Sequence, residues 1–281
     1  MVTLEVGRRP RSIWVALAVV VVYIVFAAGL GNLFSGLVDE NQAAAEFALG
    51  HLIPLPLAIV FLLLFLRWSG WGSDVWREHP TPSLTPRRWW LLSIPLLVGL
   101  LPISQLGEIP WASRSAGFIA LIALGTLMVG FGEELVVRGI LLTAIRARHG
   151  EFATLVTTSA VFGAAHIPGS VIEGVPVVVI AIQFIALTGV GVAYYWVRRV
   201  TGRLWVGMVI HAATDWVLYL DSGAGTPTVS LGNNHDMTPG TWITATLQTL
   251  LWIATATSIV SVIREDRRNR KRATVSHPTA A

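Results

Sequence analysis

Long apolar runs separated by short polar connections dominate the pattern of this chain. The runs lie at about 13–33, 47–66, 89–106, 116–148, 152–167, 175–197, 204–220 and 241–263. At 1.5 Å of rise per residue, a helix of roughly 20 residues crosses about 30 Å of hydrocarbon. The pattern therefore predicts an all-α, polytopic membrane protein with about eight transmembrane helices.

The composition supports membrane residence and a single domain. Of 281 residues, 54% are hydrophobic and only 13% are charged, a balance that is unusual for a soluble domain. No internal repeat and no soluble domain is visible, so we expect one membrane domain over residues 1–263. The chain has no cysteine, which excludes disulfides and thiolate metal sites.

The basic residues cluster at helix ends, and they predict the orientation. If every predicted helix spans, 19 of the 20 Lys and Arg residues lie on one side, and only Arg114 lies opposite. By the positive-inside rule both termini are then cytoplasmic, in a multi-pass protein of the cell (plasma) membrane. The basic clusters lack the face that nucleic-acid binding needs, so no nucleic acid partner is expected. Residues 264–281 are predicted to form a basic, disordered cytoplasmic tail.

The segment 116–148 places charged side chains inside an apolar helix. Glu133, Glu134 and Arg138 lie in "GFGEELVVRG", at a depth where each charge costs at least about 2.5–3.5 kcal/mol. Glu134 and Arg138 are four residues apart, which puts them on one helix face as an ion pair. Glu133 points about 100° away around the helix. It is therefore the carboxylate that is free to act.

Two further helices carry polar residues that we expect to meet this acid. His166 lies in "VFGAAHIPG" and His211 and Asp215 lie in "HAATD". A tight turn at 148–151, with Gly150 as a left-handed cap, would set Glu133 and His166 at the same depth of an antiparallel hairpin. Small residues flank all three sites and allow close helix approach. The sequence predicts one intramembrane polar cavity that holds these groups.

The three motifs resemble a known family. "EELVVR", "FGAAH" and "HAATD" follow the order EExxxR, FxxxH and HxxxN/D of the CPBP intramembrane proteases, also called the ABI or CAAX-protease-like family, which includes the Ras-converting CAAX endopeptidase. The resemblance covers about residues 116–220.

The resemblance implies catalytic roles for the six residues. Glu133 is implied as the general base toward water, with His166 orienting or deprotonating that water. The Glu134–Arg138 pair is implied to hold the site in shape, and His211 to stabilise the oxyanion. Asp215 takes one of two roles, either orienting His211 or donating a hydrogen bond while protonated.

A metal mechanism is the alternative for the same residues. Zinc accepts two histidines and a carboxylate with water as the fourth ligand, and that set would be His166, His211 and Glu133. An HExxH motif is absent. We favour a cofactor-free mechanism in which Glu133 activates water without zinc.

Three functions are compatible with the motifs. The first is an intramembrane endopeptidase that cuts a membrane-associated peptide or protein, with the lipid bilayer as its surroundings. The second is a non-catalytic scaffold or immunity protein of the same fold. The third is a proton-coupled transporter, because buried acids and histidines also form proton relays. CAAX cleavage itself is not carried over, and the physiological substrate is left open.

Overall fold

The computed structural model describes residues 9–39, 42–79, 86–224 and 238–276. Within these ranges the chain is helical, and the only extended pairing is an isolated bridge between Arg77 and Arg203. The predicted all-α class is confirmed.

Helical segments coincide with all eight predicted apolar runs. The first half of the chain contains α1 (Ile13–Ile24), the π-helical η1 (Val25–Leu30), α2 (Gly31–Ser35), α3 (Ala43–Leu52), α4 (Pro54–Ser69), α5 (Gly72–Trp76), η3 (Trp89–Leu92), α6 (Ser93–Gln105) and η4 (Trp111–Ser113). The second half contains α7 (Ala116–Glu134), the π-helical η5 (Leu135–Leu141), α8 (Leu142–Arg146), α9 (Glu151–Ala165), α10 (Ile167–Ile172), α11 (Val177–Thr201), α12 (Leu204–Ser222) and α13 (Pro239–Ser276).

The number of eight membrane spans is not confirmed. Six helical stretches of the described residues are long and apolar enough to cross a membrane: Ile13–Ser35, Ala43–Ser69, Ala116–Arg146, Glu151–Ile172, Val177–Thr201 and Pro239–Arg272. The stretch Trp89–Gln105 is apolar but shorter. Helix α12 is long enough, but it is not among the six, and its polar residues His211 and Asp215 lower its hydropathy. Helix α12, which carries two of the candidate site residues, is thus one of the two segments that depart from the prediction.

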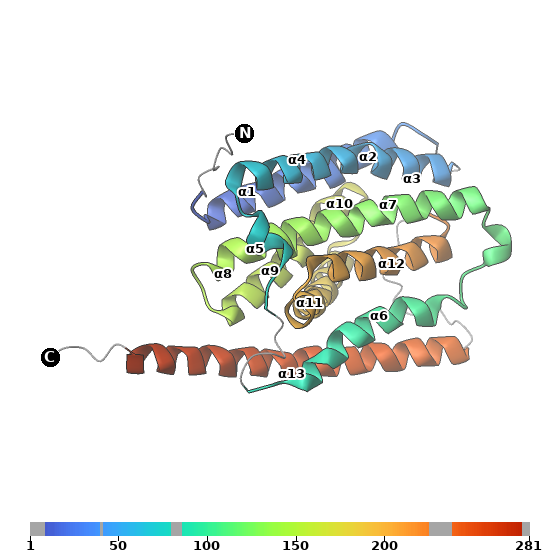
Figure 1. The fold of residues 1–281 in the computed structure, drawn as a ribbon. Helices are drawn as coiled ribbons and strands as arrows, with labels where there is room; N and C mark the ends of the chain where they lie inside the picture. The colour runs from blue at the N-terminus through green and yellow to red at the C-terminus, as the bar shows by residue number, and fades with distance from the viewer. Residues whose placement is uncertain (1–8, 40–41, 80–85, 225–237, 277–281) are drawn as a thin grey trace, which may run out of the picture.

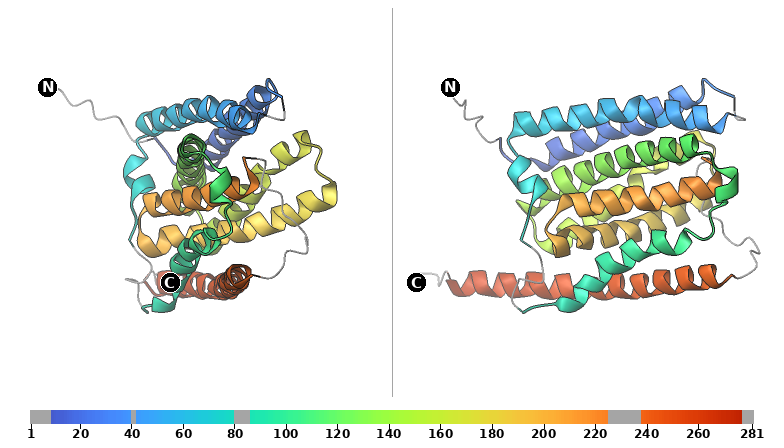
Figure 2. Two further views of the ribbon diagram at one scale, coloured as in Figure 1. Left: turned by 90° about the vertical axis from the view of Figure 1, so that its right-hand side faces the viewer. Right: turned by 45° about the vertical axis from the view of Figure 1, so that its right-hand side comes forward.

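The helices form a bundle with α7 and α12 near its middle, and α11 crosses it, so that α11 is seen nearly end-on where α7 and α13 run across the view (Figure 1). Helices α1 to α4 cover one side, and α6 and α13 cover the opposite side in both further views (Figure 2). One apolar core joins α1, α4 and η5, and another joins α6, α9, α11 and α13. The polar residues of α7 and α12 are therefore enclosed by helices on both sides.

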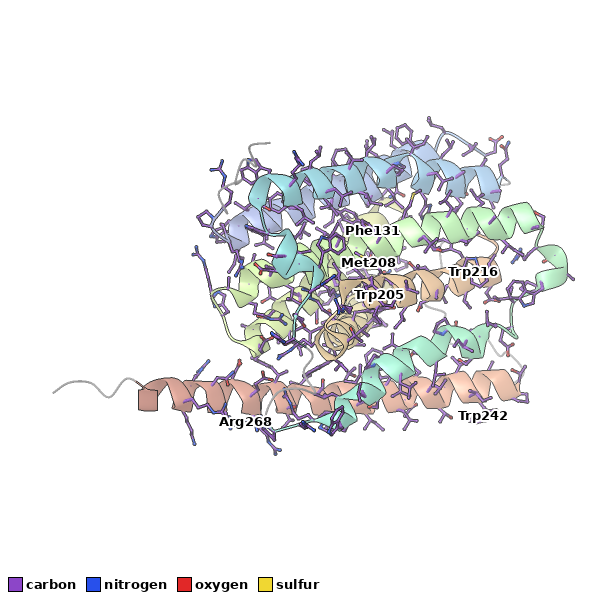
Figure 3. All side chains as sticks on the ribbon, in the orientation of Figure 1. Phe131, Trp205, Met208, Trp216, Trp242 and Arg268 are labelled. Carbon is purple, nitrogen blue, oxygen red and sulfur yellow. The ribbon has the colours of Figure 1, made fainter. Side chains whose placement is uncertain are left out.

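The C-terminal helix corrects the prediction of a disordered tail. Helix α13 continues to Ser276, so residues 264–276 are helical, while residues 277–281 lie outside the described residues. Trp242 lies near the start of α13 and Arg268 toward its other end, on the side of the bundle where α1 begins (Figure 3). Glu265 explains the order, because it accepts hydrogen bonds from Arg88 at 2.8 Å and from Arg199 at 3.1 Å. These partners neutralise a buried acid that sequence alone assigned to a solvated segment.

The turn before α9 also differs from the expectation. Gly150 is the N-cap of α9 in an extended conformation, with φ −69° and ψ 171°, and it is not a left-handed cap. A Cβ at this position would lie 2.5 Å from Asp266 Oδ2. The Asp266 carboxylate accepts from the amides of Glu151 at 2.9 Å and Phe152 at 3.0 Å. Glycine is needed here because a side chain of α13 caps α9.

Candidate active site

The first two acids lie where an α-helix changes into a π-helix. Glu133 and Glu134 are the last residues of α7, and Arg138 lies in η5 directly after them. A π-helical turn contains an extra residue, which changes the direction of the side chains that follow, and such turns are frequent at functional sites.

Glu134 and Arg138 form the predicted ion pair. Both side chains are 0% exposed, and Arg138 Nη1 lies 2.9 Å from Glu134 Oε1. The guanidinium carbon lies 4.1 Å from the ring centroid of Phe162, and Nη2 donates to the Gly191 carbonyl at 3.4 Å. Because the pair is removed from both water and lipid, loss of either partner leaves an uncompensated buried charge.

His211 connects three carboxylates across two helices. Its Nδ1 lies 3.2 Å from Glu134 Oε1, while its Nε2 lies 3.6 Å from Asp215 Oδ2 and 3.8 Å from Glu133 Oε2. A carboxylate only accepts hydrogen bonds, so the Nδ1–H of His211 donates to Glu134. The ring thereby joins α7 to α12 and turns Nε2 toward the other two acids.

His166 is oriented by a local break in its helix. Its amide bonds to the Gly163 carbonyl at 3.4 Å, and α10 begins after it with Pro168 in the first turn. The Phe162 carbonyl, one turn back, lies 2.9 Å from His166 Nδ1. Because a carbonyl only accepts, Nδ1 carries the proton, and Nε2 of the neutral ring is left with a free lone pair.

Phe162 brings His166 to the rest of the cluster. Its ring centroid lies 5.1 Å from that of His166 and 5.9 Å from that of His211. All six predicted site residues therefore lie around one centre. Glu133, Glu134 and Asp215 approach the His211 ring, and Arg138 contacts Glu134. His166 is connected to His211 through Phe162, whose ring lies near both.

The six residues divide by exposure. Glu134 and Arg138 are completely buried and His211 is 8% exposed, whereas Glu133 and Asp215 expose 22% and 20% of their side chains. The buried groups form a fixed frame. The open side of that frame presents the carboxylates of Glu133 and Asp215.

Glycines permit the close approach that the contacts require. A Cβ at Gly130 would lie 2.5 Å from the Met208 carbonyl oxygen and 2.8 Å from the Ala212 amide nitrogen. A Cβ at Gly207 would lie 3.0 Å from Glu134 Oε2. Helices α7 and α12 are thus nearly in backbone contact at the depth of the acids, as the small residues predicted.

Comparison with known proteins agrees with this centre. Residues 115–217 match the family described as type II CAAX prenyl endopeptidase Rce1-like. This stretch is similar to the Rce1-like family. It contains all six candidate residues, and the resemblance inferred from the three motifs is confirmed for it. No curated protein and no solved structure matches the chain.

Two tyrosines at the Rce1-like centre were not predicted. The Tyr194 ring lies 5.1 Å from the His211 ring, and the Arg138 guanidinium lies 5.4 Å from it. Tyr23 comes from α1, outside the Rce1-like stretch, and packs against Gly132. Both tyrosines stand in apolar runs, where hydropathy does not show which helix face meets the protein interior.

The alternative zinc set does not fit the described residues. Among them, no three His, Asp or Glu side chains group in a way that could hold a metal ion. In the part of the chain that the structure describes, His166 meets the cluster only through the ring of Phe162. The set His166, His211 and Glu133 is therefore not assembled as zinc ligands in the Rce1-like centre.

Proposed function

We propose that this chain is a multi-pass membrane endopeptidase of the CAAX-protease type, which hydrolyses a peptide bond of a membrane-associated peptide or protein. One observation carries the proposal: three ordered motifs on α7, α9 and α12 converge on the His211 ring within the Rce1-like stretch. Buried charges at this depth are costly, and a peptidase centre accounts for all of them together.

Glu133 is the proposed general base. It is the partly exposed acid of the adjacent pair, and it has no share in the Glu134–Arg138 ion pair. Glu133 takes a proton from water, the hydroxide oxygen attacks the peptide carbonyl carbon, and a tetrahedral oxyanion forms. The same proton then passes to the departing amine as the carbon–nitrogen bond breaks.

His166 assists at the water. Because the Phe162 carbonyl holds the proton on Nδ1, the lone pair of Nε2 accepts a hydrogen bond from that water. The ring needs no rearrangement for this role, since the helix break at Pro168 already orients it. This preorganisation is what makes a positioned histidine effective as a catalytic partner.

His211 and Asp215 serve the oxyanion. His211 Nε2 faces the open side of the centre. An N–H at this position donates a hydrogen bond to the negative charge that develops on the oxyanion, and one such donor is typically worth about 2.7–4 kcal/mol of transition-state stabilisation. Asp215 lies 3.6 Å from the same nitrogen. Of the two roles left open for Asp215, this contact favours orientation of His211.

The proposed location is the cell (plasma) membrane, with both termini cytoplasmic. The start of α1 and the end of α13 lie at the same end of the bundle (Figure 1). Arg146, Glu151 and Arg199 form ion pairs at this end, at 2.8 Å and 3.0 Å. An excess of Arg and Lys at one end is typical of the cytoplasmic side.

Proteomics of membrane fractions tests the proposal. Cells that express wild type, Glu133→Gln or Glu108→Gln at equal levels are compared for new peptide N-termini. Glu108 is an exposed acid after α6, away from the centre, and serves as the matched control. We expect a set of N-termini that wild type and Glu108→Gln share and that Glu133→Gln lacks. Identical profiles for all three proteins would instead support a non-catalytic scaffold.

A further inference from the structure

Tyr23 lies on a helix outside the Rce1-like stretch and places a polar group next to the proposed base. The side chain is 4% exposed, in the last turn of α1. A Cβ at Gly132 would lie 2.6 Å from Tyr23 Oη and 2.8 Å from Cε2. The phenol therefore rests on the backbone of the residue that precedes Glu133, and Gly132 is the residue that makes room for it.

The Tyr23 hydroxyl is buried and has no hydrogen-bond partner among the described residues. A buried hydroxyl without a partner destabilises the fold, and phenylalanine would fill almost the same volume without that cost. Glu133 follows Gly132 directly in the chain, and Glu133 and Asp215 are the two partly exposed acids of the centre.

We propose that Tyr23 is a positioning residue for Glu133. The Tyr23 hydroxyl donates a hydrogen bond to the Glu133 carboxylate, directly or through the water that the carboxylate activates. The inference rests on the proposed peptidase function. The second oxygen of Glu133 is then free to take the proton from water. Helix α1 becomes a functional part of the centre, although the family match begins at residue 115.

The test compares Tyr23→Phe with Val19→Ala. Tyr23→Phe removes only the hydroxyl and keeps the ring on Gly132. Val19 lies one turn earlier on α1 and is 5% exposed, so Val19→Ala loosens the same helix without touching the hydroxyl. The probe is an internally quenched peptide that spans the strongest Glu133-dependent cleavage site, presented to purified protein in mixed lipid–detergent micelles.

We expect Tyr23→Phe to lower kcat about tenfold or more with little change in KM, because the hydroxyl acts on the base and not on substrate binding. Its thermal unfolding midpoint should equal or exceed that of wild type. Val19→Ala should lower the midpoint and keep kcat. Wild-type kcat in Tyr23→Phe, or equal losses of kcat and midpoint in both variants, would overturn the positioning role. If Glu133→Gln abolishes no cleavage, the peptidase function itself fails, and this inference fails with it.

Discussion

Replacement of Gly130 by alanine tests whether close contact between α7 and α12 assembles the centre. The added Cβ would lie 2.5 Å from the Met208 carbonyl oxygen and 2.8 Å from the Ala212 amide nitrogen. Both atoms belong to the backbone of α12, so no side chain can rotate away. Ordinary contact begins at 3.4 Å, and the two helices must therefore separate by about 0.9 Å.

That separation exceeds what the centre tolerates. The bond between His211 Nδ1 and Glu134 Oε1 is already 3.2 Å long, and it would lengthen to about 4 Å, beyond hydrogen-bond range. A misplacement of about 1 Å in a catalytic group costs on the order of 10²-fold in rate. Overpacking adds a loss of about 1–3 kcal/mol in stability. We expect Gly130→Ala to lose most cleavage while still folding.

The assay measures Glu133-dependent N-termini in membranes and the thermal midpoint of purified protein. Gly117→Ala is the matched control, because Gly117 lies in the same helix and a Cβ there meets nothing within 4 Å. Alanine at that position should be neutral or stabilise by up to about 1 kcal/mol. Wild-type cleavage by Gly130→Ala would refute the argument that backbone contact between the two helices sets the geometry.

Three further predictions concern the ion pair, the C-terminal helix and the cofactor. Arg138→Met should lower the free energy of unfolding by about 3–5 kcal/mol, and the double variant with Glu134→Gln should recover most of that loss. If the losses of the two substitutions simply add in tryptophan-fluorescence melting, the buried ion pair does not act as described. Asp266→Ala should lose about 1 kcal/mol through the cap of α9, whereas exposed Arg270→Ala should stay within about 0.5 kcal/mol; equal melting midpoints would argue against the cap. Cleavage that depends on Glu133 should survive treatment with a zinc chelator, and a requirement for stoichiometric zinc would overturn the metal-free mechanism.

Hydropathy and helix geometry anticipated much of this molecule. In lipid the backbone must satisfy its own hydrogen bonds, so an apolar run of sufficient length becomes a helix. All eight runs are helical for this reason, although only six stretches meet the length and hydropathy of a span. The pairing of Glu134 with Arg138 followed from the periodicity of one helix, a purely local property.

Where the expectations were wrong, the cause was a partner far away in the sequence. Residues 264–276 resemble a solvated basic tail, yet Glu265 is ordered by Arg88 and Arg199. Gly150 resembles a left-handed cap, yet Asp266 supplies the cap of α9 from 115 residues away. Composition describes what a segment would do alone, and it contains no information about charges on other helices.

The sequence by itself determined the helices, the pairing of Glu134 with Arg138 and the identity of the three motifs, because each depends on local spacing or on the solvent. The tertiary structure alone decided that His211 contacts three acids and that the Tyr23 hydroxyl lies against Gly132. Lipid and protein interior are both apolar, so the pattern of a membrane helix does not show which of its faces turns inward. Only packing makes that choice, and packing here places helix α1 beside the acids of α7.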